Sequence, residues 1–221
     1  MQQVTRLIYV HDPMCSWCWG FRPVFDQLCR ELEGRLPITR LLGGLARDSA
    51  DPMPIEMQRH LQDTWRRIQQ RIPGTRFNFD FWRICAPRRS TWPACRAVLA
   101  ARRLDPAQET AMIAAIQRAY YLTARNPSDD GTLIALAGEL GLDDVAFTTQ
   151  LNAPHTHEQL AEEIAHARRI GANSFPSLRL QIDTSVWPIA VDYNQVAPMR
   201  EAIDALPVSY THLTLPTKRI V

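Results

Sequence analysis

The sequence predicts an α/β protein in which a large block of helices interrupts a small sheet. Three observations predict this class. An apolar, β-branched run at residues 4–10 precedes a helical pattern and a second strand-like run at 37–42. The middle of the chain, 46–154, has mostly helical periodicity, and two more strand-like runs follow at 177–182 and 186–191. With 221 residues, 46% of them hydrophobic, the chain can bury one sizeable core.

The first elements predict a strand–helix–strand unit. After the strand at 4–10, apolar residues recur at helical spacing from Phe21 onward. Pro23 lies in the first turns and should kink or reset this helix, and Gly34 should end it. The strand at 37–42 follows. This order predicts a right-handed βαβ unit with two parallel strands.

The middle segment is expected to be a series of helices. They are predicted at residues 57–72, 90–103, 107–123 and 130–140, with a short helix opening at Asp143.

The C-terminal part predicts a helix, two antiparallel strands and a last helix. Thr156 is the expected N-cap of a helix that runs to Arg169, and Gln159 would complete a capping box. The strands at 177–182 and 186–191 follow, and a helix is expected over 194–206. Proline in the second strand suggests that this strand is an edge of the sheet.

These elements predict one discontinuous unit made of residues 1–45 and 155–207, with 46–154 as an inserted helical domain. Residues 208–221 have a different composition: they are rich in Thr and Leu, contain no acid, and carry the single lysine, Lys218, of a chain with 24 arginines. We therefore expect 208–221 to be a non-native or disordered tail.

The motif Cys15-Ser16-Trp17-Cys18 lies between the first strand and the first helix. Two cysteines two residues apart at such a junction suit reversible thiol–disulfide chemistry. Unpaired N–H groups at the helix N-terminus favour a thiolate on Cys15. Half of a zinc site is the alternative, but zinc needs four ligands and no second CxxC or Cys/His pair is present. His155 and His157 are expected to be solvated, so no metal is predicted.

The run from His11 to Phe21, HDPMCSWCWGF, resembles the DsbA-like branch of the thioredoxin superfamily, and especially its cytoplasmic members related to the FrnE proteins, often described as predicted protein-disulfide isomerases. The CxxC motif, the helical insertion and Phe175-Pro176 before the third strand carry the resemblance. It implies a thioredoxin-like fold with a large helical insertion. It also implies a cis Phe175–Pro176 bond facing Cys15, where the backbone would pair with an extended substrate.

The resemblance implies a role for each residue of the site. Cys15 would be the exposed nucleophile, and Cys18 the deeper cysteine that resolves the mixed disulfide. Many thioredoxin-like enzymes carry a buried acid where this chain has Tyr9, so His11, Asp12 or water could take up the proton of Cys18. His11 could equally be a polar rim residue. The expected substrate-binding residues are Trp17, Trp19, Phe175 and Pro176, and the expected redox-tuning residues are Ser16, His11 and Asp12.

The resemblance favours a thiol–disulfide oxidoreductase or disulfide isomerase that exchanges with protein thiols, protein disulfides or glutathione and is reset by a recycling redox partner, with no other cofactor. One alternative is a glutathione-dependent isomerase or transferase of the 2-hydroxychromene-2-carboxylate isomerase or kappa class. These typically have serine at the first cysteine, whereas this chain keeps both. Another alternative is a non-catalytic peptide-binding or chaperone module.

Composition and the remaining cysteines add further expectations. A net charge of +2 with scattered basic residues argues against nucleic acid as a partner. No apolar run is long enough to span a membrane. Residues 1–6 do not form a signal peptide, which predicts a cytoplasmic protein. Cys29 is expected in the core. Cys85 and Cys95 could form a second redox pair, in which Cys95 would be reactive because Arg88 and Arg89 lie near it.

Overall fold

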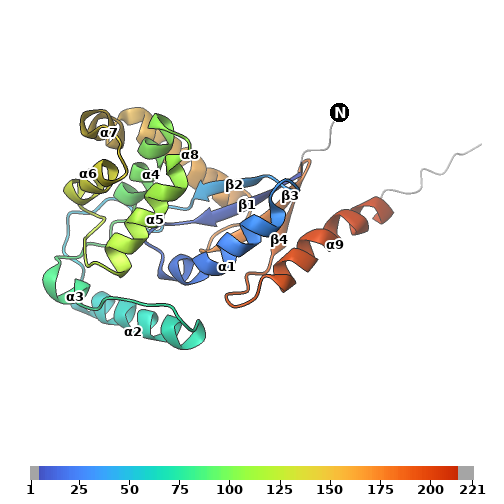
Figure 1. Cartoon of the computed structure of the whole chain (residues 1–221), viewed down its shortest axis with the longest axis horizontal. Helices are drawn as coiled ribbons and strands as arrows, with labels where there is room; N and C mark the ends of the chain where they lie inside the picture. Colours follow the sequence, from blue (N-terminus) through green and yellow to red (C-terminus); the bar gives the residue numbers. More distant parts are fainter. Residues whose placement is uncertain (1–4, 214–221) are drawn as a thin grey trace, which may run out of the picture.

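A computed structural model describes the backbone of residues 5–213 and the side chains of residues 5–206. It contains a four-stranded mixed sheet in the order β2-β1-β3-β4. The strands are β1 (Thr5–His11), β2 (Ile38–Leu42), β3 (Ser177–Ile182) and β4 (Ser185–Ile189). β1 runs parallel to β2 and antiparallel to β3, and β3 runs antiparallel to β4. The predicted α/β class and the parallel βαβ unit are confirmed, and Figure 1 shows the arrangement.

Helices account for most of the remaining chain. They are α1 (Ser16–Leu32), α2 (Ile55–Arg71), α3 (Phe81–Ile84), α4 (Trp92–Leu104), α5 (Gln108–Tyr121), α6 (Asp130–Glu139), α7 (Asp144–Leu151), α8 (Pro154–Arg169) and α9 (Ala197–Leu213).

The central strand β1 is buried on both faces, which explains its unbroken apolar run. Leu7 and Tyr9 point to one face and pack with apolar residues of α1 and α9. Ile8 and Val10 point to the other face and pack with Leu41, with Ala167 of α8 and with Ala172 after it. Successive side chains of a strand alternate between faces, so two separate apolar layers form from one short segment.

Two local predictions need correction. Pro23 lies inside α1 and does not reset it, because the helix is continuous from Ser16 to Leu32, whereas the kink stays a prediction. An interior proline removes one backbone hydrogen bond and crowds the preceding turn, and the buried face of α1 provides the packing that offsets this cost. The capping box at Thr156 is wrong as well. α8 begins at Pro154, and the Thr156 hydroxyl donates instead to the carbonyl of Gln150, 2.8 Å away.

The inserted helices share one apolar core with the region around the CxxC motif. This core contains Trp65 and Tyr121, which pack against each other, and it also includes Met14 and Leu42. The inserted helices therefore cover one side of the motif. The division into 1–45 with 155–207 and an insertion of 46–154 stays a prediction. α9 continues to Leu213, and residues 214–221 lie outside the described part.

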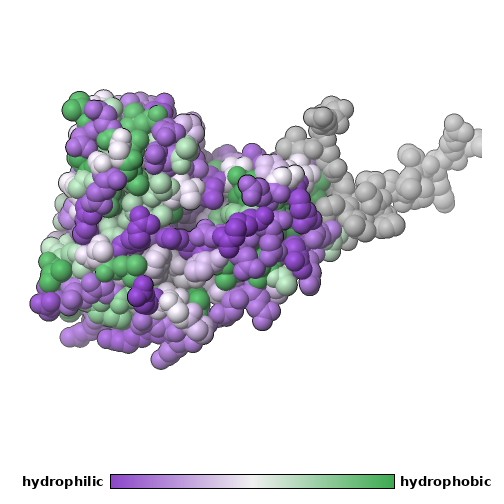
Figure 2. All heavy atoms as spheres, viewed as in Figure 1, coloured by the Kyte–Doolittle hydropathy of each residue, from purple (hydrophilic) through white to green (hydrophobic). Residues whose placement is uncertain are grey.

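Figure 2 shows hydrophilic residues spread over one face of the molecule, with hydrophobic residues in smaller groups between them. Within residues 5–213, the chain has no helix with the length and apolar character needed to cross a bilayer.

Candidate active site

The CxxC motif lies at the junction between β1 and α1. β1 ends at His11, and the backbone N–H of Cys15 donates to the Asp12 carbonyl, 3.0 Å away, closing a turn between them. Cys15 is the N-cap of α1, and its carbonyl accepts from the N–H of Trp19 at 3.1 Å. The motif therefore presents Cys15 at the end of the helix where N–H groups are unpaired, as its position in the sequence predicts.

Cys15 and Cys18 are both buried, with 6% and 0% of their surface exposed. The expectation of an exposed Cys15 is therefore wrong, because inserted helices and the Phe175 loop close around it. Hydrogen bonding from the Cys18 thiol lowers the pKa of Cys15, supported by the backbone N–H of Cys18 and opposed by burial and Asp12. Burial and the neighbouring Cys15 raise the pKa of Cys18 well above its usual value. The pair therefore favours a thiolate on Cys15 and a thiol on Cys18.

The loop before β3 faces Cys15 across the site. The Phe175–Pro176 bond is cis, as expected, and the carbonyl oxygen of Phe175 lies 3.5 Å from Cys15 Sγ, within reach of the thiol proton. Gly43 makes this approach possible, because a Cβ there would lie 2.1 Å from the Phe175 ring. Gly44 has a φ of +60°, a conformation that favours glycine. The loop after β2 thus holds Phe175 in place.

Asp12 is fully buried and anchors the turn before Cys15. Its carboxylate accepts from the N–H groups of Met14 at 2.8 Å and Leu45 at 2.7 Å. It also accepts from the Thr91 hydroxyl at 2.6 Å and the Cys95 thiol at 3.5 Å. Burial raises the pKa of Asp12, and these donors oppose the rise. Asp12 therefore links the active-site turn to the start of α4.

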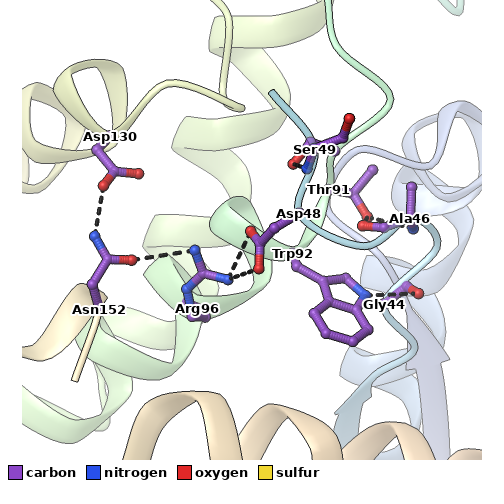
Figure 3. Close-up of polar contacts among 10 residues, drawn as sticks. Gly44, Ala46, Asp48, Ser49, Thr91, Trp92, Arg96, Asp130 and Asn152 are labelled. Atoms are coloured by element: carbon purple, nitrogen blue, oxygen red, sulfur yellow. Dashed lines mark hydrogen bonds and ion pairs between the residues drawn. The ribbon is translucent and has the colours of Figure 1, made fainter. Parts of the chain in front are cut away.

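Figure 3 shows how α4 fixes the loop that follows β2. The N–H of Ala46 donates to the Thr91 hydroxyl at 3.0 Å, and the Trp92 ring N–H donates to the Gly44 carbonyl at 3.2 Å. Arg96 binds both carboxylate oxygens of Asp48, at 2.8 and 2.9 Å. This network positions the N–H of Leu45, on the same loop, which donates to the Asp12 carboxylate.

Tyr9 and His11 lie behind the motif. His11 is 1% exposed, so the rim alternative is wrong. Burial, with smaller contributions from the charges of Arg40 and Arg102, lowers the pKa of His11 from 6.5 to about 3. His11 is therefore neutral, and its Nε2 has no hydrogen-bond partner among the described residues. Burial, then the charge of Cys18 and a hydrogen bond with it, raise the pKa of Tyr9 well above normal.

A groove of about 390 Å³ opens beside Cys15. Trp17 and Phe175 line it, together with Arg67 and Arg89 from the inserted segment. Trp19 lies elsewhere: it stacks on Tyr121, and its ring N–H donates to the Arg76 carbonyl at 3.0 Å. The groove therefore unites the predicted residues Ser16, Trp17 and Phe175 with Cys15 and does not include Trp19.

The remaining cysteines do not form a second active site in the structure. Cys95 is fully buried, and burial together with Asp12 raises its pKa well above normal, so the expected reactive Cys95 is wrong. The Cys85 thiol donates to the Ala124 carbonyl at 3.1 Å, and all five cysteines are free thiols. Among the described residues, no cluster of three or more His, Cys, Asp or Glu side chains could hold a metal ion.

Sequence reasoning missed several groups at the site. The sequence predicts no role for Arg67 or Thr91, and it predicts Arg89 beside Cys95, whereas the structure places Arg67 and Arg89 in the lining of the groove at Cys15. Their positions in the chain carry no local signal of this kind, because Thr91 is 79 residues from the Asp12 that it binds.

Comparisons with known proteins agree with this geometry. In structure, the chain resembles a candidate protein disulfide isomerase from Nitrosomonas europaea, with a TM-score of 0.81 and 26% identity over 93% of this chain and 98% of that one. It also resembles the cytosolic disulfide reductase DsbM from Pseudomonas aeruginosa, with a TM-score of 0.72 and 27% identity over 95% and 100%. DsbM with glutathione matches at a TM-score of 0.67 and 28% identity over the same shares.

No curated protein matches the chain in sequence. The family model of the DSBA-like thioredoxin domain matches residues 6–197, which include both cysteines, the inserted helices and Pro176. Strand order, helical insertion and the cis proline beside the CxxC motif all accord with that match. The chain belongs to the DSBA-like thioredoxin domain family, whose members are thiol–disulfide oxidoreductases.

Proposed function

We propose that this chain exchanges disulfides with protein substrates, with isomerase-like activity, through Cys15 and Cys18. Cys15 attacks a substrate disulfide, and one substrate sulfur leaves as a thiolate. Cys18 then attacks the Cys15 sulfur of the mixed disulfide, which releases the second substrate thiol and forms the Cys15–Cys18 disulfide. The opposite pKa shifts of the two cysteines carry this proposal, since they assign one sulfur to attack and the other to resolution.

The groove supports a substrate-binding role for Trp17 and Phe175. Both line the groove that opens at Cys15. The cis Phe175–Pro176 bond lies next to Cys15, and its neighbouring backbone can pair with an extended peptide. A peptide held there would bring its disulfide to the sulfur.

Glutathione is the small thiol that we propose as a co-substrate. Arg89 is half-buried in the groove and makes no hydrogen bond or ion pair with the described residues, and Arg67 is exposed beside it. Such cations suit the carboxylates of glutathione. The similar DsbM structure that contains glutathione supports this assignment, and the cytosolic location of DsbM supports a cytoplasmic one.

A redox titration tests the proposed function. The protein is equilibrated in glutathione buffers of graded potential, its thiols are trapped with an alkylating reagent, and the product is mapped by mass spectrometry. We expect a Cys15–Cys18 disulfide to form, and insulin reduction to require Cys15. The variant Cys15→Ser should neither form this disulfide nor reduce insulin. Cys29→Ser, a change outside the motif, should do both. Absence of that disulfide at every potential would rule the function out.

A further inference from the structure

A second, smaller cavity lies next to Cys18, and we call it the rear cavity. Its volume is about 100 Å³, and residues of α1, α5, β1 and β2 line it. Cys18 lines the rear cavity and not the groove, whereas Cys15 lines the groove and not the rear cavity. The two sulfurs therefore open onto different spaces.

Both buried and surface groups line the rear cavity. Tyr9, His11 and Cys18 line its buried part and are at most 5% exposed. Asp26 lines its outer part with a side chain that is 45% exposed and pairs with Arg22 at 3.6 Å. At about 30 Å³ per water, the volume accommodates roughly three water molecules.

The chemistry of resolution requires a route for one proton. Cys18 holds its proton in the resting state, as burial and the Cys15 thiolate favour the thiol. During resolution, the substrate and the mixed disulfide occupy the groove in front of Cys15. A proton that leaves Cys18 therefore needs another way out, and the rear cavity is the space that Cys18 itself lines.

We propose that the rear cavity is the proton path of the resolving cysteine, with Tyr9 as the positioning residue at Cys18 and Asp26 as the proton acceptor at the mouth. This inference rests on the proposed function, because it describes the second half of that reaction. In that step the Cys18–H bond breaks, a Cys15–Cys18 bond forms, and the bond between Cys15 and the substrate sulfur breaks. The two cysteines are oxidised, the substrate sulfur leaves with the electron pair, and the proton passes to Asp26 and solvent.

The groups that face the rear cavity fit this role. Tyr9 lies beside Cys18, which contributes to the raised pKa of Tyr9, and His11 is a neutral imidazole whose Nε2 has no hydrogen-bond partner among the described residues and can therefore bond to a water. The titratable and charged groups lining the cavity are Tyr9 and His11 from β1, Cys18, Arg22 and Asp26 from α1, and Arg40 from β2. α5 adds Thr110 and Gln117, which do not titrate, so Asp26 is the carboxylate of this lining.

The test separates attack from resolution. Reduced protein is mixed with oxidised glutathione, quenched with acid at successive times, and analysed by mass spectrometry as reduced, glutathionylated and internally disulfide-bonded protein. Tyr9→Phe removes only the hydroxyl, and Ala114→Leu fills the rear cavity from α5 without changing a polar group. We expect attack to stay within twofold of wild type in both, and resolution to slow at least tenfold. The rate of resolution in the wild type should also fall in D₂O. In Tyr9→Phe, the pH at which the resolution rate reaches half of its maximum should be higher than in wild type.

Tyr121→Phe is the matched control, because the Tyr121 hydroxyl is buried, has no hydrogen-bond partner among the described residues, and belongs to a residue that lines neither space. It should resolve at the wild-type rate. Wild-type resolution in folded Tyr9→Phe or folded Ala114→Leu would overturn the proposal. If Tyr9→Phe does not fold, Ala114→Leu and Asp26→Asn decide the same question. Failure of the wild-type protein to form any mixed disulfide contradicts the proposed function instead, so the two failures are distinguishable.

Discussion

The ring of Phe175 packs directly on the backbone of Gly43, with no room for a side chain between them. A Cβ on Gly43 would lie 2.1 Å from two atoms of that ring. A hydrogen bond also fixes Gly43 to β1, since its N–H donates to the His11 carbonyl at 2.7 Å. The strand that precedes the CxxC motif therefore sets the position of the loop that faces it.

Gly43→Ala should displace Phe175 and its carbonyl from Cys15. We expect the attack of Cys15 on oxidised glutathione to slow about tenfold and the free energy of unfolding to fall by about 1–3 kcal/mol, the usual cost of overpacking. Gly131→Ala is the control, because nothing lies within 4 Å of its Cβ position. That variant should keep the wild-type rate and gain stability. Equal attack rates in Gly43→Ala and wild type would contradict this packing argument.

Asp12→Asn should make Cys15 more acidic. The negative charge of Asp12 raises the pKa of Cys15, so removing that charge favours the thiolate. The rate of Cys15 alkylation, followed against pH, should reach half of its maximum at a lower pH than in wild type. Stability should fall by about 1–3 kcal/mol, because an amide cannot satisfy all the buried donors.

Asp48→Asn is the matched control for Asp12→Asn, since Asp48 lies on the loop after β2 that Asp12 binds through the N–H of Leu45, and its carboxylate binds Arg96. Its Cys15 alkylation profile should match that of wild type. If the midpoint pH of Cys15 alkylation were higher in Asp12→Asn than in wild type, the charge of Asp12 would lower the pKa of Cys15 and not raise it.

His11 should make the protein less stable in mild acid. Its pKa is lowered from 6.5 to about 3 on folding, so the unfolded chain binds a proton where the folded protein does not. The resulting stability is present above about pH 6.5 and is lost as the pH falls toward 3. From about pH 6.5 to pH 5 the loss should approach 2 kcal/mol.

Urea unfolding of wild type and His11→Phe at several pH values measures this contribution. The difference between their free energies of unfolding isolates the contribution of His11, because Asp12 is present in both proteins. The raised pKa of Asp12 acts in the opposite sense, since it favours the folded state in acid. We expect the wild type to lose more stability than His11→Phe over this range. Parallel pH profiles would mean that His11 is protonated in the folded protein.

Brief alkylation at neutral pH should label Cys15 before any other cysteine. Its pKa is lowered, whereas the pKa values of the other four cysteines are raised, mainly by burial. Cys18 and Cys95 should react only after unfolding, because both are fully buried. Peptide mapping by mass spectrometry checks the order. Early labelling of Cys95 would instead support the prediction of a reactive Cys95, which its burial contradicts.

The local features of this protein could be predicted from its sequence. Strand and helix periods placed the βαβ unit and most helix positions, because those periods reflect which faces are buried. The CxxC motif and Pro176 predicted the pair of sulfurs that we propose to react, and the loop with the cis bond that faces Cys15. Errors occurred where local preference competes with packing, as at Pro23, which lies inside a continuous helix.

Only the tertiary structure decided what surrounds the two sulfurs. Asp12 is bound by Thr91 from α4, and Arg89 reaches the groove from the inserted segment. The rear cavity needs α5 to close it over Cys18. These neighbours are far apart along the chain, and no local period records which of them will meet. The sequence by itself therefore indicated the thiol–disulfide chemistry that we propose for Cys15 and Cys18, whereas long-range packing decided their burial, their unequal acidity and the separate spaces that they line.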